Sequence, residues 1–536
     1  MRQKLDRVMY EISVVYIALP VFIFLAGWLR IIVAIPVCVI FLISVYLMLK
    51  NKPEPVAWHL TKAQGGILIA SVILLAVWVF LSGQGGFAFQ NSDYQYRNAI
   101  FHDLIDKSWP VIYSFPSQNA AVSASIASTP SIDILTYYIA FWLPGSLVGK
   151  IFGWYAANVF LYLWALLGVV LIAYYLFRTV RKTSIWTVLI LIFFSGMDIL
   201  GYISVFSKLP GPIDHIEWWS GLQYSSNTTQ LFWVFNQTIA VWLAILLIMN
   251  MKNSRSLFFL YAMLLLHAPF PFLGMLPIVL WKAYQGYPLS LRSNNTVQTN
   301  LIRTIFVWLW SGVRRAITFE NVCGGISVLL IVYLYLSNNI SAAKTGTNSV
   351  TMNYFVFIIF EFGIFMIFLF ADHYKNPLFW ICLISLIVIP FFRIGTSQDF
   401  CMRVSIPALF MVQIMVQQTL IGKAALRGTA KNPAAADNPA ITDKPAVTAD
   451  ALPRANKYAL TEHDMKLIRV MLAVVLLIGT VVPIQEISRS VVYTLPPYNV
   501  TWADTVKTLA NSEIQSSNFL GSVKDNLFYE YLARKS

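Results

Sequence analysis

The sequence predicts an all-α, polytopic membrane protein with about 13 helical passes. Its 536 residues are 58% hydrophobic and 12% charged, with a mean hydropathy of +0.66. Soluble domains carry roughly 25% charged residues, so the composition excludes an ordinary soluble fold. Apolar runs long enough to cross a bilayer recur along the chain, and basic residues fall mainly between them. Both observations are typical of multi-pass helical proteins.

The candidate spans are apolar segments close to the roughly 20 residues that a transmembrane helix needs. The first follows a basic stretch and lacks a small-residue cleavage site, which indicates an uncleaved first span rather than a signal peptide. The segments are residues 12–29, 31–49, 66–82, 154–177, 184–203, 230–250, 321–336, 352–371, 377–394, 404–421 and 467–487.

Two further apolar regions are ambiguous. Residues 134–150 are short and are interrupted by a Pro-Gly pair, and residues 257–282 contain the sequence HAPFP, whose prolines break a helix. All the basic loops can face the cytoplasm only if 134–150 does not cross the membrane. The region 257–282 must then enter and leave on one side as two short helices. This topology places the N-terminus inside and the C-terminus outside.

The predicted domain organisation follows from these spans. Residues 422–466 are rich in Ala and Pro and low in aromatic residues, which indicates a disordered cytoplasmic linker. The remaining parts are a transmembrane module over 1–421 with outer loops 83–153 and 204–229, a last span at 467–487, and a small extracytoplasmic tail over 488–536.

Several classes of function are disfavoured by the sequence. The net charge of +14 is explained by the positive-inside rule, so nucleic-acid binding is not expected. The four cysteines show no CxxC spacing and predict neither a metal site nor a disulfide framework. The chain lacks the GxxxxGK[ST], HExxH and GxSxG motifs, which argues against an ATP-driven pump and a soluble-type hydrolase.

The first outer loop contains the most polar stretch near a span, GGFAFQNSDYQYRNAIFHDLIDKSWPVIY at residues 85–113. Asn91 or Ser92 can cap a helix that begins near Asp93. The spacing predicts an amphipathic helix lying in the plane of the membrane interface. Its apolar face comprises Tyr96, Ile100 and Leu104, and its polar ridge comprises Asn98, His102 and Asp106.

The acids of this helix have two interpretations. Asp93 could act in catalysis, or it could serve only the helix, since acids near a helix start favour the dipole. His102, Asp103 and Asp106 could contact a substrate or simply form a solvated or structural face.

Polar residues elsewhere also suggest a site at the outer surface. Asp198 lies in the apolar sequence LIFFSGMDILG, where an acid usually faces a cavity or a partner, although helix capping explains it equally well. The second outer loop contains PIDHIEWW, whose paired tryptophans are either interfacial anchors or a floor for sugar rings. His215 and Glu217 of this loop could bind a hard divalent cation together with Asp93. His267 is expected to be a buried core histidine.

Two arginines flank a short outer turn that contains Asp399. Arg393 and Arg403 lie where the positive-inside trend disfavours basic residues. They could pair with Asp399 or snorkel to lipid headgroups. Alternatively, their planar guanidinium groups could clamp a lipid-linked phosphate.

Taken together, these stretches resemble the GT-C superfamily of polytopic membrane glycosyltransferases. The family pattern places an acid soon after a span in a large first outer loop, followed by interfacial helices. Here FQNSDYQYRNAIFHDLI matches it, with Asp93 as the acid. The stretches YYIAFWLPGSLVGKIFG, FFSGMDILG and HIEWWSGLQYSSNTTQLFWVFNQ are similar to those of uncharacterised bacterial membrane proteins of this type. Many family members carry a pair of acids where NSDYQ has one.

The resemblance implies an inverting transfer of a sugar from a polyprenyl-phosphate-linked donor to an extracytoplasmic glycan or lipid. It implies Asp93 as the base or as a metal ligand, with Glu217 as a second ligand of Mg²⁺ or Mn²⁺. The protein would lie in a bacterial cytoplasmic membrane, with its active face outside. The expected substrate- and donor-binding residues are Tyr94, Arg97, His102, Asp103, Asp198, His215, Glu217, Trp218, Trp219, Arg393, Asp399 and Arg403.

Two other classes of protein remain open. A transporter, flippase or polymerase of lipid-linked saccharides predicts charged residues along several spans around a central cavity. A transferase predicts that they gather at one face. A non-catalytic scaffold predicts no such cluster.

Overall fold

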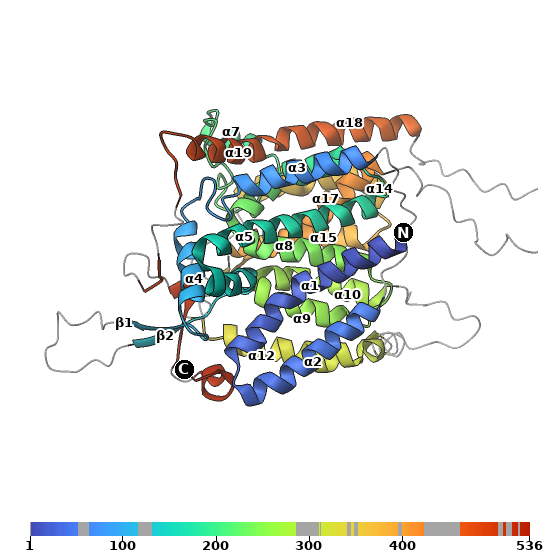
Figure 1. Cartoon of the computed structure of the whole chain (residues 1–536). Helices are drawn as coiled ribbons and strands as arrows, with labels where there is room; N and C mark the ends of the chain where they lie inside the picture. Colours follow the sequence, from blue (N-terminus) through green and yellow to red (C-terminus); the bar gives the residue numbers. More distant parts are fainter. Residues whose placement is uncertain are drawn as a thin grey trace, which may run out of the picture.

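Helices that run side by side make up most of the chain in the computed structural model, and the two termini lie at opposite ends of the bundle (Figure 1). Helices account for nearly all the regular structure, in agreement with the predicted all-α fold. The structure describes residues 2–51, 64–115, 131–285, 310, 312–339, 345–347, 352–394, 399–422, 461–501, 507–510, 517–523 and 526–535.

The described residues up to Tyr284 form ten α-helices. They are α1 (Arg2–Trp28), α2 (Ile31–Lys50), α3 (Gly65–Leu81), α4 (Tyr94–Asp106), α5 (Leu143–Val180), α6 (Ile185–Phe193), α7 (Asp198–Phe206), α8 (Asn227–Asn250), α9 (Leu257–His267) and α10 (Pro269–Tyr284).

The second half contains shorter helical pieces, several of which follow one another without a loop. They are the π-helical turn η3 (Glu320–Gly325) with α12 (Ile326–Leu336), then α13 (Met352–Ile358), the π-helical turn η4 (Ile359–Gly363) and α14 (Ile364–His373), then α15 (Pro377–Val388), α16 (Asp399–Val404), α17 (Ile406–Ile421), α18 (Glu462–Gly479), α19 (Val481–Thr494) and the short turn η7 (Phe528–Leu532).

Within the described residues, seven helical stretches are long and apolar enough to cross a bilayer. The chain is therefore a multi-pass helical membrane protein. The predicted count of about 13 passes also relies on shorter apolar helices and remains a prediction. The seven stretches are Leu5–Trp28, Ile31–Lys50, Ala140–Val180, Ile185–Phe206, Asn227–Asn250, Met352–His373 and Glu462–Thr494, and the shorter ones are Gly65–Leu81, Leu257–His267, Glu320–Leu336, Pro377–Phe391 and Ile406–Ile421.

The two ambiguous regions are both interrupted in the structure. Residues 134–150 contain the end of a strand, a short 3₁₀ turn and the first turns of α5, which bends at Gly153 where φ is 83°. Residues 257–282 form α9 and α10, which meet at the non-helical Ala268. The rings of Tyr261 and Phe272 stack across this hairpin. His267 is buried, and its Nε2 contacts the carbonyl oxygen of Ile17 at 3.0 Å, which confirms it as a core histidine.

The last predicted span begins earlier and ends later in the structure than the sequence predicted. Most of the predicted linker 422–466 lies outside the described residues. Its final residues are helical, because α18 starts at Glu462 with a capping box between Thr461 and Asp464. The helical stretch continues through a break at Thr480 to the end of α19 at Thr494, beyond the predicted end of the span at residue 487.

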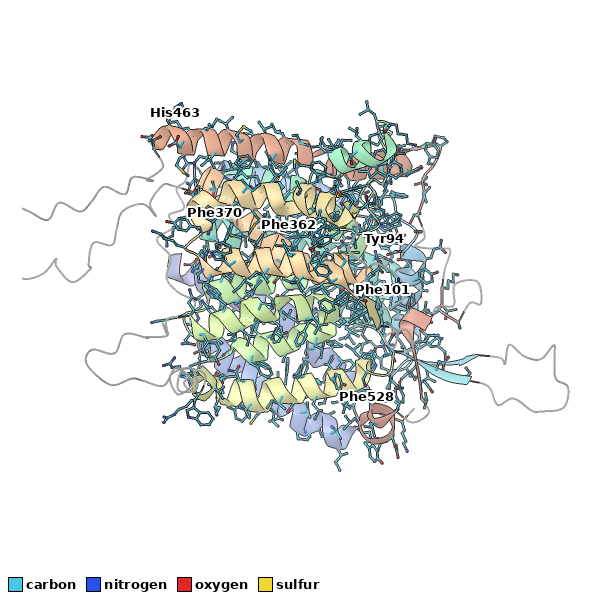
Figure 2. All side chains as sticks on the ribbon, turned by 180° about the vertical axis from the view of Figure 1, so that it is seen from behind. Tyr94, Phe101, Phe362, Phe370, His463 and Phe528 are labelled. Carbon is cyan, nitrogen blue, oxygen red and sulfur yellow. The ribbon has the colours of Figure 1, made fainter. Side chains whose placement is uncertain are left out.

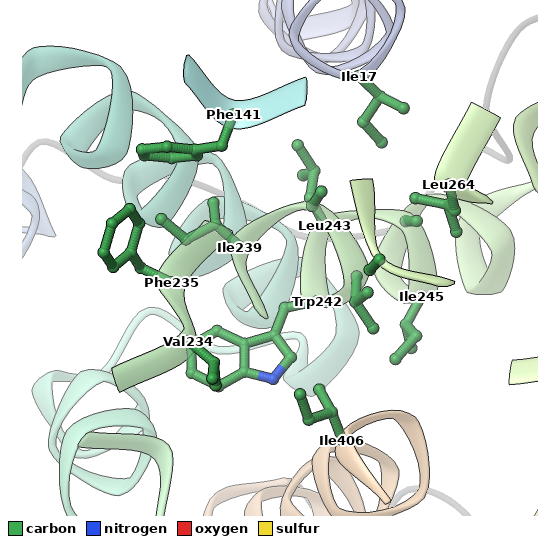
Figure 3. Close-up of a cluster of buried hydrophobic side chains, with 14 of the residues drawn as sticks. Ile17, Phe141, Val234, Phe235, Ile239, Trp242, Leu243, Ile245, Leu264 and Ile406 are labelled. Carbon is green, nitrogen blue, oxygen red and sulfur yellow. The ribbon is translucent and has the colours of Figure 1, made fainter. Parts of the chain in front are cut away.

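The centre of the bundle is α8, which is buried along almost its whole length. Figure 3 shows Trp242 of this helix next to Val234 and Ile406, with Phe235 facing Phe141. Polar side chains on α8 are therefore enclosed by protein and must find partners there.

One end of the bundle, called here the α4 end, holds most of the non-helical structure. Helix α4 lies across the bundle at this end, and strands β1 (Ile112–Phe115) and β2 (Ser131–Leu135) project from it (Figure 1). Strand β5 (Leu520–Ser522) completes an antiparallel sheet in the order β1-β2-β5, with Ile134 opposite both Ile112 and Gly521. Strands β3 (Thr345–Thr347) and β4 (Phe392–Ile394) form a second, antiparallel pair.

The predicted polar ridge of α4 is largely covered by protein. Asn98 and His102 are buried, and of that ridge only Asp106 is exposed. The His102 ring stacks on Trp154 with ring centroids 3.6 Å apart. Asp103 binds the C-terminal tail, which agrees with the structural alternative for these residues rather than with a solvated face.

The opposite end gathers basic residues that flank the spans. Asp6 of α1 pairs with Arg178 near the end of α5 at 3.2 Å. Asn51, which follows α2, donates a hydrogen bond to Ser256 at the start of α9. Antiparallel packing brings these segments together, since the Tyr10 hydroxyl donates to the Met48 carbonyl oxygen.

Substituting Gly274 by Ala should destabilise the protein. A Cβ at this position of α10 would overlap the carbonyl oxygen of Val404, so the helices must separate, at a cost of about 1–3 kcal/mol. Thermal unfolding in detergent measures the effect. Gly66→Ala is the matched control, because a Cβ at Gly66 meets nothing within 4 Å. Equal melting temperatures for the two variants would contradict the close packing of α10.

Candidate functional site

The bend in α8 organises the α4 end. Val234 departs from helical geometry, with φ −139° and ψ 33°. Side chains from the first outer loop donate to the carbonyl oxygens just before the bend. Asn91 Nδ2 donates to Phe232 at 3.0 Å, Gln84 Nε2 to Leu231 at 3.4 Å, and Arg97 Nη2 to Trp233. The bend therefore fixes the loop that carries Asp93.

Asp93 lies at the edge of this arrangement. Its backbone N–H donates to Asn91 Oδ1 at 3.1 Å, as expected for a loop residue before a helix, and its own carboxylate does not cap α4. The carboxylate instead pairs with Arg97, with 2.8 Å between Oδ2 and Nη2. The Asp93 side chain is 43% exposed, whereas that of Arg97 is 5% exposed. An accessible acid thus stands in front of a buried arginine.

Arg403 is the second arginine of this region. It pairs with Asp399 at 2.8 Å, which was one of the alternatives predicted from the sequence. It also donates to the Tyr138 hydroxyl. Asp93 interacts electrostatically with Arg403, and both arginines act on Tyr138. We call Asp93, Arg97, Tyr138, Asp399 and Arg403 the Asp93 site. Arg393 lies on the neighbouring β4 and is half-buried.

Each arginine of the Asp93 site keeps one N–H group unpaired. Arg97 Nη1 and Arg403 Nε are buried and have no hydrogen-bond acceptor among the described residues. Unpaired buried donors of charged groups are costly. They indicate where the oxygen atoms of an anionic ligand or of water would bind.

A second group of predicted residues lies apart from Asp93. Asp198 and Glu217 are wholly buried and lie near each other and near Glu361, which is 2% exposed. We call these three residues the buried acid cluster. Trp219 is also buried there, and its Nε1 faces Glu361 at 3.3 Å. Asp198 and Trp219 are therefore enclosed by protein, and their part in substrate binding stays a prediction.

The expected metal pair of Asp93 and Glu217 gains no support from these contacts. The Glu217 oxygens accept hydrogen bonds from Gln223 Nε2 and the Ser226 backbone N–H, each at 2.8 Å. In the described part of the chain, no group of three or more His, Cys, Asp or Glu residues could hold a metal ion. The metal pair therefore stays a prediction from sequence.

A third group links the second outer loop to the last helix. His215 Nδ1 lies 2.6 Å from Glu486 Oε1, which Arg489 also contacts at 2.8 Å. Trp233 Nε1 donates to Glu486 Oε2 at 3.0 Å. Trp218 packs against His215 and is 60% exposed. Trp233 thus joins this group to the Asp93 site, since its carbonyl oxygen binds Arg97.

Two more residues predicted to contact a substrate are buried and have protein partners. Tyr94 is 2% exposed, and its hydroxyl donates to the Ser82 carbonyl oxygen, so it holds the loop in place. Asp103 is 1% exposed. Its carboxylate accepts hydrogen bonds from Tyr113, Thr508 and the Leu509 backbone N–H and anchors the tail.

Sequence reasoning missed Glu361, Glu486 and Tyr138. Glu361 had a readable signal, because an acid inside the apolar sequence FVFIIFEFGIFMIF is costly unless it is partnered. Glu486 and Arg489 stand three residues apart near the end of the last apolar run, which is a helical pairing distance. Tyr138 gave no signal, since tyrosines are frequent at membrane interfaces.

Comparison of the chain with protein families, with curated proteins and with solved structures finds no match. The resemblance to GT-C glycosyltransferases therefore remains an expectation from sequence.

Arg97→Ala should lower the free energy of unfolding by about 1–3 kcal/mol, because it leaves the Trp233 carbonyl oxygen at the bend without its donor. The matched control is Arg7→Ala, which removes another Arg from an i,i+4 ion pair with Glu11. Arg7 is 66% exposed, so its loss should change stability by less than about 1 kcal/mol. Chemical unfolding in detergent compares the two. A similar small loss for both would show that Arg97 does not support the bend.

The pH dependence of stability should reflect Glu217. Burial, reinforced by the Asp198 carboxylate, raises the pKa of Glu217 from 4.5 to about 7. The folded state then holds this proton more tightly than the unfolded state. The resulting stability is fully present below pH 4.5 and is lost as the pH rises to about 7.

His215 should add to this trend at higher pH. Burial alone would lower its pKa, but the bonded Glu486 carboxylate raises it above 6.5. Its contribution is present below pH 6.5 and is lost as the pH rises through the raised value.

Melting temperatures measured against pH should fall less steeply in Glu217→Gln than in the exposed control Asp106→Asn. Identical slopes in the two variants would contradict the raised pKa of Glu217.

Proposed function

We propose that this protein is a membrane glycosyltransferase that moves a sugar from a polyprenyl-phosphate-linked donor to an extracytoplasmic glycan or lipid acceptor. The observation that carries the proposal is the Asp93 site. There, a half-exposed carboxylate stands beside two arginines, each with one unpaired N–H group. The resemblance of the first outer loop to GT-C enzymes agrees with this reading, and a bacterial cytoplasmic membrane with the site outside suits such donors.

The arginines suit the phosphate of the donor. Guanidinium N–H groups bind phosphate oxygens through charge-assisted hydrogen bonds, and the planar group presents several donors at once. Arg97 Nη1 and Arg403 Nε would gain acceptors from one phosphate. The same contacts would stabilise the negative charge that builds on the leaving phosphate.

Asp93 suits the role of base. Its exposure leaves the carboxylate open to an acceptor hydroxyl, whose proton it would take as the oxygen attacks C1 of the sugar. The bond from C1 to the phosphate oxygen breaks as the new glycosidic bond forms, so the configuration at C1 is inverted. Arg97 would keep the Asp93 carboxylate oriented through their ion pair.

Trp218 suits the sugar ring. It is exposed, and it contacts Trp233, whose carbonyl oxygen binds Arg97. The flat indole face accepts the C–H face of a sugar, while the Trp218 Nε1 group is held by Gln223 at 2.8 Å. Sugar and phosphate would then occupy neighbouring positions at the α4 end.

A flippase or polymerase of lipid-linked saccharides is the second candidate. The observation that favours it is the buried acid cluster, because acids placed inside a bundle are typical of transport proteins. The transferase is preferred because the accessible charged groups of the Asp93 site gather at one end of the bundle.

Asp93→Asn should abolish sugar transfer while the protein stays folded, because the amide cannot accept the hydroxyl proton. The assay follows labelled sugar from a polyprenyl-phosphate-linked donor pool in membranes that contain the protein. Asp106→Asn, an exposed acid on the same helix, is the control and should keep full activity. Full transfer by Asp93→Asn would remove this residue from the mechanism.

Arg403→Gln should weaken the binding of polyprenyl phosphate by about tenfold to a hundredfold, as expected for the loss of a charge-assisted hydrogen bond. Thermal stabilisation by added polyprenyl phosphate in nanodiscs measures the affinity. Asp93→Asn should bind at least as well as the wild type, since it removes a negative charge near the phosphate. Unchanged binding in Arg403→Gln would contradict the phosphate clamp.

A further inference from the structure

The span over residues 185–206 is broken in its interior. Helix α6 ends at Phe193 and α7 begins at Asp198. The backbone groups of the break find partners in neighbouring elements. The Met197 N–H donates to the Phe360 carbonyl oxygen at 2.9 Å, and the Asn227 N–H donates to Phe194 at 3.0 Å. Non-helical backbone inside a membrane protein requires such partners, so the break is a built feature of the fold.

The segment that faces this break is also irregular. Glu361 lies on the π-helical turn η4, a kind of bulge found frequently at functional sites. Gly196 packs directly against it, and a Cβ there would overlap Glu361 Oε2. Figure 2 shows the neighbouring Phe362 inside the bundle, between Tyr94 at the α4 end and Phe370 toward the other end. Asp198 and Glu361 are therefore buried on two of the membrane-spanning stretches, and Glu217 of the second outer loop lies near them.

Asp198 and Glu361 are hydrogen-bonded to each other. Their remaining contacts are few, with Asp198 Oδ2 accepting from Ser195 at 3.2 Å and Glu361 Oε1 from Trp219 at 3.3 Å. Asp198 Oδ1 and Glu361 Oε2 have no other donor in the part of the chain that the structure describes. An ionised carboxylate only accepts hydrogen bonds, so this pair requires a proton on one partner.

No cationic side chain in the described part of the chain pairs with Asp198 or Glu361. Among the ion pairs of the described residues, none involves Asp198, Glu217 or Glu361. The titratable groups that face Glu361 besides its partner are Glu217, Tyr224 and Cys401. Two buried carboxylates in an apolar surrounding cannot both be ionised without a counter-ion.

We propose that Asp198 and Glu361 form a proton-binding site inside the bundle, with one proton shared between them and Glu217 as the group through which it exchanges. The inference is independent of sugar transfer. Acids at membrane depth commonly carry protons between partners. The exchange is a swap of two protons: the O–H bond on Glu361 breaks as one forms on Glu217, while the proton that Glu217 held returns to the pair. Asp198 and Glu361 are then never both ionised.

The route from Glu217 leads toward the α4 end. Glu217 interacts electrostatically with His215 and Glu486, the two residues that also meet Arg489. His215 is 12% exposed and packs against the exposed Trp218. A proton leaving the pair therefore meets a carboxylate and then an imidazole before it reaches the surface.

Infrared spectroscopy of the purified protein tests the site. Near pH 8, a protonated carboxyl C=O band should be present in the wild type and lost in Glu361→Gln. The exposed Asp372→Asn, on the same span, is the matched control and should keep the band. The proposal is overturned if the wild type shows no such band, or if Glu361→Gln leaves the band in place.

Two further measurements complete the test. If Glu361→Gln does not fold, Asp198→Asn gives a second readout, since Glu361 then loses its carboxylate acceptor and its band should shift. An unchanged band in Asp198→Asn would overturn the shared proton. Replacing potassium by sodium in the buffer should leave the wild-type band in place. Its loss in sodium would identify an alkali cation as the occupant and would also overturn the proposal.

Discussion

The carbonyl oxygens at the bend of α8 impose the constraint on which the α4 end depends. Helix α8 is enclosed by the bundle, so neither lipid nor bulk water can serve these oxygens. Asn91 and Arg97 supply donors from the first outer loop, and Arg97 in turn holds Asp93 at the rim. A backbone requirement in the core thereby sets the position of Asp93, an accessible acid of the candidate site.

The need of buried polar groups for hydrogen-bond partners also explains how the other outer segments are held. Asp103 collects donors from the tail, and Glu486 collects donors from the second outer loop and from α8. Each is a buried carboxylate surrounded by N–H or O–H groups, which lowers the cost of burying its charge. Three segments that are distant in sequence are thus fixed to one end of the bundle, and the Asp93 site lies among them.

The two groups of acids differ in what their surroundings allow. Asp93 pairs with Arg97 and is exposed, so its carboxylate is open to a ligand. Asp198 and Glu361 face each other in a dry interior without a cation, so one of them must remain protonated. Chemistry on a lipid-linked donor suits the first environment, and storage of a proton suits the second.

The sequence by itself determined the membrane class, most helices, the paired short helices around HAPFP and the core position of His267. These follow from apolar runs, prolines and burial, which are local properties of the chain. It also singled out Asp93, Arg403 and Asp399. Only the tertiary structure separated Glu217 and Asp198 from Asp93 and added Glu361 to them. The partners of a buried polar group come from segments far apart in the chain, and no local pattern records which of them meet.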